Sequence, residues 1–325
     1  MAGCPNLRAI PSLPGSTRDR ERTEPKLAHW RRVTVKEQNR NSLIGIAASL
    51  LIGALVIVAG SSGSTKVGSI AVFAVCGFIA YAINWLVFVP SNRAKTEHYF
   101  DLTGSITYLT VTVVALVLSD NLDARAVIVA VMVAVWALRL GSFLFRRVRR
   151  DGRDGRFDRI KTDPLRFFMT WTLQGLWVLL TLAAALAIIT GTERRELGWI
   201  AIVGIVVWTA GFAIEVIADQ QKSVFKRNPA NDGRFIKSGL WAWSRHPNYF
   251  GEITLWIGIA IMAVPVLSGW RWAMLISPIF VVLLLTRVSG IPMLEVRAEK
   301  RWGEESEYQE YTSRTPVLIP RPPRS

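Results

Sequence analysis

The sequence predicts an all-α fold, a polytopic bundle of membrane-spanning helices. Of its 325 residues, 51% are apolar and 13 are Trp, and few charges interrupt the apolar runs. This composition is typical of an integral membrane protein. A helix needs roughly 20 apolar residues to cross a bilayer. Eight runs come near that length, at 42–60, 67–90, 102–118, 124–145, 167–190, 198–218, 250–267 and 272–292. The third run is short and rich in Thr, so seven spans are the alternative.

The net charge of +15 is spread unevenly along the chain. Of the 39 Lys and Arg residues, 33 lie in the two termini and in three alternate loops, and only five lie in the remaining loops. Loops rich in Lys and Arg stay on the cytoplasmic side of a membrane. We therefore expect both termini and the three long loops in the cytoplasm. The same asymmetry accounts for the net positive charge, so no nucleic-acid partner is needed to explain it.

The cysteines and histidines give no metal-ligand pattern. Cys4 lies in the N-terminal tail and Cys76 in an apolar run, while His29, His98 and His246 are far apart in the sequence. Zinc sites and disulfide frameworks require closer or regular spacing. We expect neither a metal nor a disulfide.

Polar residues share one helical face at the start of the third span. Asp101, Ser105 and Tyr108 are spaced i, i+4 and i+7, so they point together into the bundle. A Tyr backed by a carboxylate can donate a hydrogen bond to a substrate carbonyl. An acidic helix start beside an interfacial Tyr fits the pattern at least as well.

The sixth span ends with two carboxylates, Glu215 and Asp219, spaced i, i+4. Carboxylates at the membrane boundary are costly unless they accept hydrogen bonds or meet cations. Lys222, Lys226 and Arg227 follow directly and could pair with them. The hydroxyl or amide groups of a bound nucleotide could equally supply the donors.

The segment SRHPNYFGE, residues 244–252, marks the point where a basic loop turns into the seventh apolar run. Pro247 suits the first position of a helix, which leaves the N–H groups of Asn248 and Tyr249 unpaired. With Arg245 beside them and the positive end of the helix dipole, these groups form a site for a phosphate. A simple helix start with an interfacial Tyr is an equal alternative.

After the eighth span we expect a helix from Met293 to Gly303, which brings Glu295 and Arg297 to the same cytoplasmic face. The sequence contains no strand–GxGxxG–helix unit and no Walker lysine motif. A nucleotide would therefore be held by membrane helices instead of a Rossmann sheet.

These motifs together resemble those of the membrane steroid 5α-reductase-like family. The resemblance rests on WAWSRHPNYFGE, on IADQQK before it and on EVRAEKRWGEESEYQEY after two apolar spans. FDLTGSITY, residues 100–108, is similar to an early motif of the bacterial branch grouped as DUF1295. The resemblance covers roughly residues 80–320.

The resemblance implies a reductase that uses NADPH to reduce the carbon–carbon double bond of an apolar enone, which enters from the bilayer. Tyr108 and Asp101 are provisional candidates for polarising the substrate ketone. Glu215 stands where many family members have Asn. The residues that the resemblance implies near the cofactor, together with those that the sequence pattern places there, are Glu215, Asp219, Lys222, Lys226, Arg227, Arg245, His246, Asn248, Tyr249, Glu252, Glu295 and Arg297.

The resemblance also suggests how the chain is divided. Residues 1–41, rich in Arg, Pro and Ser, are expected to form a disordered basic cytoplasmic tail. Residues 42–190 form the helical half on the substrate side, and residues 191–325 form the half that binds the cofactor. A bacterial inner membrane is the expected location.

Two other functions fit parts of the pattern. RHPxYxG, a late Glu and an aromatic ending also resemble the isoprenylcysteine and phospholipid methyltransferases, which use S-adenosylmethionine, and Glu295 falls where those enzymes carry a Glu. The full PNYFGE segment and the basic loop before it favour the reductase, because S-adenosylmethionine has no phosphate. A transporter would place polar residues along a midplane pathway instead of at one cytoplasmic corner.

Overall fold

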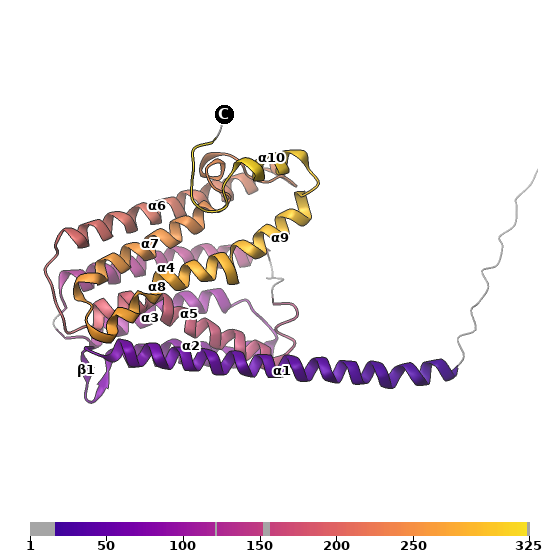
Figure 1. Ribbon diagram of the computed structural model, residues 1–325, viewed down its shortest axis with the longest axis horizontal. Coiled ribbons are helices and arrows are strands. Elements are labelled where there is room, and N and C mark those ends of the chain that lie inside the picture. The colour runs from indigo at the N-terminus through magenta and orange to yellow at the C-terminus, as the bar shows by residue number, and fades with distance from the viewer. Residues whose placement is uncertain (1–16, 121, 152–156, 324–325) are drawn as a thin grey trace, which may run out of the picture.

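The computed structural model describes the backbone of residues 17–120, 122–151 and 157–323, and their side chains except those of 17–35 and 147–151. These residues form a bundle of helices that run side by side (Figure 1). Eight helices of the described part are long and apolar enough to cross a membrane. The predicted polytopic bundle of eight spans is thereby confirmed.

The first six spans lie in α1 (Thr17–Ser61), α2 (Val72–Ala94), α3 (Phe100–Leu118), α4 (Ala124–Asp151), α5 (Pro164–Thr190) and α6 (Trp199–Arg227). The seventh is α7 (Pro247–Ala263), and the eighth combines α8 (Ile276–Leu283), a π turn (Leu284–Val288) and α9 (Ile291–Trp302). A short hairpin, β1 (Lys66–Val67) and β2 (Ile70–Ala71), joins α1 to α2, and α10 (Ser306–Arg314) follows α9. Short 3₁₀ turns occupy Pro229–Asn231, Gly239–Ala242, Val264–Val266 and Gly269–Leu275.

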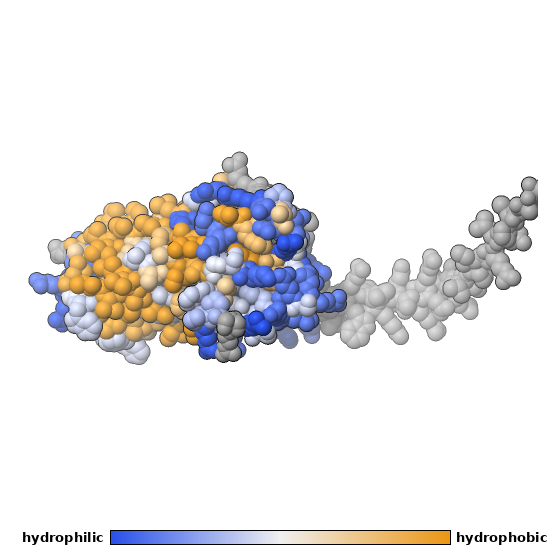
Figure 2. All heavy atoms as spheres, turned by 90° about the horizontal axis from the view of Figure 1, so that it is seen from above, coloured by the Kyte–Doolittle hydropathy of each residue, from blue (hydrophilic) through white to orange (hydrophobic). Residues whose placement is uncertain are grey.

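The two ends of the bundle differ in character. We call the end with α10 and the α2–α3, α4–α5 and α6–α7 connections the polar end. The opposite end, with the β1–β2 hairpin and the α3–α4 and α5–α6 connections, is the hairpin end. Figure 2 shows hydrophilic residues gathered at the polar end and an apolar belt beside them, as expected for a protein that sits in a bilayer.

Two helices begin or end differently from the sequence prediction. Residues 1–41 are predicted to be disordered, but α1 starts at Thr17; residues 1–16 lie outside the described part. The loop predicted from Arg146 is helical as far as Asp151, where α4 ends. The physical reason is the same in both places, because Arg, Lys, Glu and Leu are good helix formers that extend a membrane helix into water.

Helix α5 is the centre of the bundle. Its residues from Val178 to Thr190 are all buried, and it contacts α1, α2, α3, α4, α7 and α8. Small residues such as Ala183, Ala184 and Ala185 let neighbouring helices pack closely around it. The remaining spans expose apolar residues outwards, as lipid-facing helices do.

Helices α6 and α7 pack against each other unusually closely. The contact uses Gly204 and Gly211 on α6 and Gly251 and Gly258 on α7. A Cβ atom built on Gly251 would lie only 2.6 Å from the amide nitrogen of Glu215. Small residues let membrane helices approach in this way, and here they bring the ends of α6 and α7 that carry the candidate site together.

Candidate functional site

A partly buried guanidinium joins the two carboxylates at the end of α6. Arg139 of α4 forms ion pairs through Nη1 with Glu215 Oε1 and through Nη2 with Asp219 Oδ2. Glu215 is only 3% exposed and Asp219 8%. The i, i+4 spacing predicted from the sequence therefore does place both carboxylates on one face, and Arg139 of α4 pairs with both of them.

Helix α7 completes the group. Asn248 Nδ2 donates to Asp219 Oδ1 at 3.2 Å. Glu252, one turn further along α7, lies within electrostatic range of Glu215, Asp219 and Arg139. We call Arg139, Glu215, Asp219, Asn248 and Glu252 the acidic cluster.

The acidic cluster has more carboxyl groups than guanidinium groups. Its three carboxylates face one guanidinium, and Glu215 Oε2 is buried without a hydrogen-bond partner among the described residues. A buried acceptor without a donor costs free energy. The cluster can therefore accept hydrogen bonds from a ligand that carries hydroxyl, amide or amino groups.

An aromatic layer adjoins the acidic cluster on the side of the membrane interior. Trp136 lies one turn before Arg139 on α4, and its ring packs edge-to-face against Tyr108 of α3 at 5.1 Å and against Trp256 of α7 at 5.0 Å between centroids. The indole N–H group of Trp136 interacts with Glu215, and that of Trp256 is buried and has no hydrogen-bond partner among the described residues. The aromatic layer is therefore an apolar surface that carries indole N–H donors and lies next to the acidic cluster.

The surroundings of Tyr108 differ from the expected ones. The sequence paired it with Asp101, which lies in the first turn of α3 at the polar end. The carboxylate in electrostatic range of Tyr108 is that of Glu252 on α7. Ser105 Oγ donates to the main-chain oxygen of Asp101 at 3.4 Å, a bond along the helix that ties neither side chain to Tyr108.

The start of α7 is held by Glu295 of α9. Pro247 is the first residue of α7, as the sequence predicts. Glu295 accepts from Arg245 and lies 2.8 Å from His246 Nε2, and the His246 ring stacks on Tyr249 with centroids 5.7 Å apart. Arg245, which the sequence predicts to bind a phosphate, therefore already forms an ion pair with Glu295. Its Nε atom is buried and has no hydrogen-bond partner among the described residues.

The His246 side chain is buried at the rim of the site. Burial lowers the pKa of His246 below its ordinary value, the charges of Lys222 and Arg245 act in the same direction, and Glu295 opposes them. The imidazole is therefore neutral at pH 7. Because an ionised carboxylate can only accept, a neutral His246 must carry its proton on Nε2 to bond Glu295.

The basic residues after Asp219 follow it along the last turns of α6. Lys222 Nζ lies 4.3 Å from the centroid of the Trp241 ring, while Lys226 and Arg227 are exposed at the end of α6. Arg297 is exposed on α9, two residues after Glu295 and so on a different face of the helix. The structure therefore brings Glu295 to the site but does not bring Arg297.

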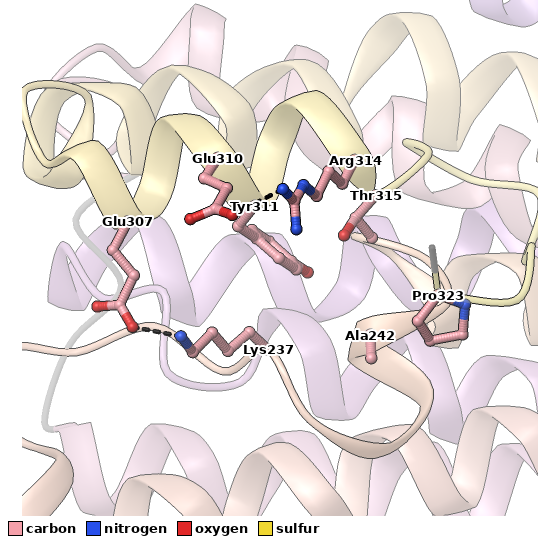
Figure 3. Close-up of a pocket in the computed structure, with 8 residues that line it drawn as sticks. All are labelled: Lys237, Ala242, Glu307, Glu310, Tyr311, Arg314, Thr315 and Pro323. Carbon is pink, nitrogen blue, oxygen red and sulfur yellow. Dashed lines mark hydrogen bonds and ion pairs between the residues drawn. The ribbon is translucent and has the colours of Figure 1, made fainter. Parts of the chain in front are cut away.

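A separate hollow of about 230 Å³ opens at the polar end (Figure 3). It is lined in part by Lys237, Glu307, Tyr311 and Arg314, and an ion pair between Lys237 and Glu307 crosses it. None of its lining residues belongs to the acidic cluster or the aromatic layer. We place the candidate site at the cluster because it combines buried, oppositely charged side chains from α4, α6 and α7 with an unpartnered Glu215 Oε2.

Sequence reasoning missed Arg139, Trp136 and Trp256. The signal for Arg139 was present, since an Arg within a membrane span needs a partner. Nothing in the pattern pointed to the two tryptophans, because their roles depend on which helices touch. No group of three or more His, Cys, Asp or Glu in the described residues is arranged to hold a metal ion.

The chain is similar to two enzymes of different classes. It is 31% identical over 104 residues to the probable O-methyltransferase ustE of Ustilaginoidea virens. The matched segment covers 32% of this chain and 36% of that protein. It is 28% identical over 129 residues to the steroid 5-alpha-reductase DET2 of Gossypium hirsutum, which covers 39% of this chain and 45% of that protein. The chain thus matches less than half the length of either relative. No solved structure matches it significantly.

The family model DUF1295, described as a protein of unknown function, matches residues 87–315. That range includes α3 to α10 and therefore the whole acidic cluster, the aromatic layer and Glu295. The likeness to DET2 agrees with the steroid 5α-reductase-like motifs around residues 244–252. The chain belongs to the DUF1295 family.

Proposed function

We propose that this protein is a membrane-embedded reductase that uses NADPH to reduce a carbon–carbon double bond of an apolar, steroid-like or lipid enone. The observation that carries the proposal is the direct contact between two unlike surfaces. A charged, incompletely paired cluster at the polar end adjoins an aromatic layer that contains Tyr108. A polar cofactor and an apolar substrate need such neighbouring surfaces.

The residues at the polar end fit the polar parts of NADPH. Glu215, which interacts with the Trp136 indole, can accept from a hydroxyl or amide group through Oε2, and Arg245 Nε can donate to a phosphate. Exposed Arg227 lies at the end of α6, the helix that carries Glu215. We assign the hydroxyl and amide contacts to the acidic cluster and the phosphate contacts to these basic residues.

Tyr108 would act at the substrate. A bound NADPH would supply the hydride for the β-carbon of the enone, and negative charge would then develop on the carbonyl oxygen. A hydrogen bond from the Tyr108 hydroxyl to that oxygen stabilises the charge, and a proton taken up at the α-carbon completes the reduction. Trp136 and Trp256 exclude water from this layer, which strengthens the hydrogen bond.

A methyltransferase that uses S-adenosylmethionine is the second candidate. The acidic cluster favours it, because three carboxylates against one guanidinium suit the sulfonium and ammonium charges of that cofactor. The likeness to ustE supports the same choice. The phosphate-compatible Arg245 and the basic residues of the loop favour the reductase.

Calorimetric titration of the purified full-length protein in detergent separates the two candidates. We expect NADPH to bind more tightly than NADH or S-adenosylmethionine, and Glu215→Gln to weaken that binding because a buried acceptor becomes partly a donor. Glu304→Gln, an exposed change at the polar end, serves as the matched control. Tighter binding of S-adenosylmethionine than of NADPH would reverse the assignment.

A further inference from the structure

Three arginines bury their guanidinium groups at the hairpin end, away from the acidic cluster. Arg125 and Arg271 are each 1% exposed, and Arg194 is partly buried. Arg125 and Arg139 lie fourteen residues apart on α4, so their main chains are separated by about 21 Å along the helix. This group therefore belongs to a different part of the molecule from the candidate site.

The hydrogen bonds of these arginines go to main-chain oxygens. Arg125 Nη1 donates to Met262 O at 2.9 Å, and its Nη2 donates to Glu196 O at 2.8 Å. Arg271 donates to Ala187 O and Arg194 to Ile188 O, near the last turn of α5. Cations at helix C-termini are stabilised by the helix dipole, which accounts for these contacts.

The carboxylates here compensate only part of the charge. Asp123 Oδ1 lies 3.8 Å from Arg194 Nη1, and it also accepts from the main-chain N–H of Ala126 at 2.8 Å. Among the described residues, no salt bridge joins Arg125 or Arg271 to a carboxylate. Glu193 lies within electrostatic range of Arg271, and Glu196 lies beside Asp123 in the same region. Arg125, Arg194 and Arg195 there face these two carboxylates, Asp123 and Glu196, so one positive charge is left over.

A hollow of about 430 Å³ lies beside this charge. Arg125 lines it, and Arg125 Nε is buried without a hydrogen-bond partner among the described residues. The exposed Arg195 lines it as well. The complete lining is Asp123, Ala124, Arg125, Arg194, Arg195, Glu196 and Leu197. A buried donor and three guanidinium groups around one hollow indicate an anionic ligand.

The neighbouring residues set the depth of the hollow in the membrane. Leu197 is 40% exposed and Trp199, at the start of α6, is 73% exposed. Exposed Trp side chains sit at the level of lipid head groups. Below that level, the first turns of α4 and α6 expose Val127 and Ile202 to the bilayer, against which acyl chains can lie.

We propose that this hollow binds the phosphate of an anionic phospholipid, with Arg125 and Arg195 as its ligands. The head-group phosphate compensates the leftover charge and satisfies Arg125 Nε. The site is independent of the proposed reductase activity, because it lies at the other end of the bundle. The Arg195 side chain makes no hydrogen bond or ion pair of its own in the described structure. If the arginines served only as helix caps, replacing Arg195 would therefore leave lipid binding unchanged.

Native mass spectrometry of the full-length protein in a non-ionic detergent tests this site. The protein is titrated with palmitoyl-oleoyl phosphatidylglycerol, with the zwitterionic phosphatidylcholine of the same chains, and with inorganic phosphate. We expect the wild type to prefer phosphatidylglycerol over both. Arg195→Gln should weaken phosphatidylglycerol binding about fivefold, the usual effect of one basic residue near an anionic membrane surface.

Two comparisons decide the outcome. Lys66→Gln removes an exposed charge at the same end, outside the lining of the hollow, and should leave the affinity unchanged. Thermal unfolding without added lipid should give the same midpoint for Arg195→Gln and the wild type, which shows that the variant folds. Equal phosphatidylglycerol affinity in Arg195→Gln and the wild type, an equal loss in Lys66→Gln, or equal binding of inorganic phosphate would each overturn the proposal.

Discussion

At the scale of single residues, the charge of Arg139 is the most consequential feature of the bundle. It lies within a membrane span, and its side chain is only 17% exposed. A charge in that position is stable because two carboxylates of α6 accept its hydrogen bonds. In turn, Glu215 and Asp219 depend on Arg139, since they bring two negative charges into the same buried region.

Replacing Arg139 should therefore destabilise the protein strongly. Removing one member of a buried ion pair leaves the other charge uncompensated, which costs about 3–5 kcal/mol. We expect Arg139→Met to lower the thermal unfolding midpoint in detergent, and Arg139→Met combined with Glu215→Gln to recover part of the loss because one stranded charge is gone. If the double variant were as unstable as the sum of both single changes, the pairing would be unimportant.

Tyr108 is the residue on which the proposed chemistry depends. Phenylalanine at this position keeps the ring that packs on Trp136 and removes only the hydroxyl. We expect Tyr108→Phe to lower kcat on the order of 10²-fold, the usual cost of one donor to a developing oxyanion, while the NADPH dissociation constant stays the same. Tyr99→Phe, a change at a 55% exposed Tyr, is the control. Wild-type turnover of Tyr108→Phe would remove Tyr108 from the site.

At the scale of elements, the α6–α7 pair positions most of the acidic cluster. Glu215 follows Gly211 by one turn on α6, and Asn248 and Glu252 flank Gly251 on α7. The four glycines let the main chains approach until these side chains meet. The geometry of the site therefore depends on residues that carry no chemistry of their own.

A methyl group added at Gly251 tests this dependence. The new Cβ would lie 2.6 Å from both Glu215 N and Gly211 O. Because these are main-chain atoms of α6, the whole helix would have to shift to make room. We expect Gly251→Ala to cost about 1–3 kcal/mol of stability, as overpacking does, and to weaken cofactor binding. Gly198→Ala, at the N-cap of α6, has nothing within 4 Å of the new atom; it should cost at most about 1 kcal/mol of stability and leave cofactor binding unchanged. Both variants are compared by thermal unfolding and calorimetric titration.

The elements show where sequence reasoning succeeds and where it stops. All eight spans could be predicted, because a bilayer demands a long apolar run for each. The start of α1 and the end of α4 could not be predicted. Where a helix extends into water, its last residue depends on local helix propensity and on packing, and no apolar run marks it. The spacing of Glu215 and Asp219 also predicted their shared face. Their pairing with Arg139, 76 residues earlier than Glu215, depends on where the whole bundle places α4 relative to α6, which no local pattern encodes.

At the scale of the whole molecule, the two ends carry different charge chemistry. The polar end combines buried carboxylates with exposed basic loops, whereas the hairpin end buries arginines against helix C-termini. The excess of Lys and Arg in the loops of the polar end predicts that this end faces the cytoplasm. Such an orientation would give the acidic cluster access to cytoplasmic NADPH.

Labelling of single cysteines in intact cells tests that orientation. In a Cys4→Ser background the remaining Cys76 is 0% exposed and should not react. Lys66→Cys places a thiol on the exposed hairpin, and Glu304→Cys places one on the exposed connection between α9 and α10. We expect a membrane-impermeant maleimide to label Lys66→Cys in intact cells but to label Glu304→Cys only after the membrane is permeabilised. The reverse pattern would put the acidic cluster outside the cell, beyond the reach of NADPH, and the proposed reductase function would fail with it.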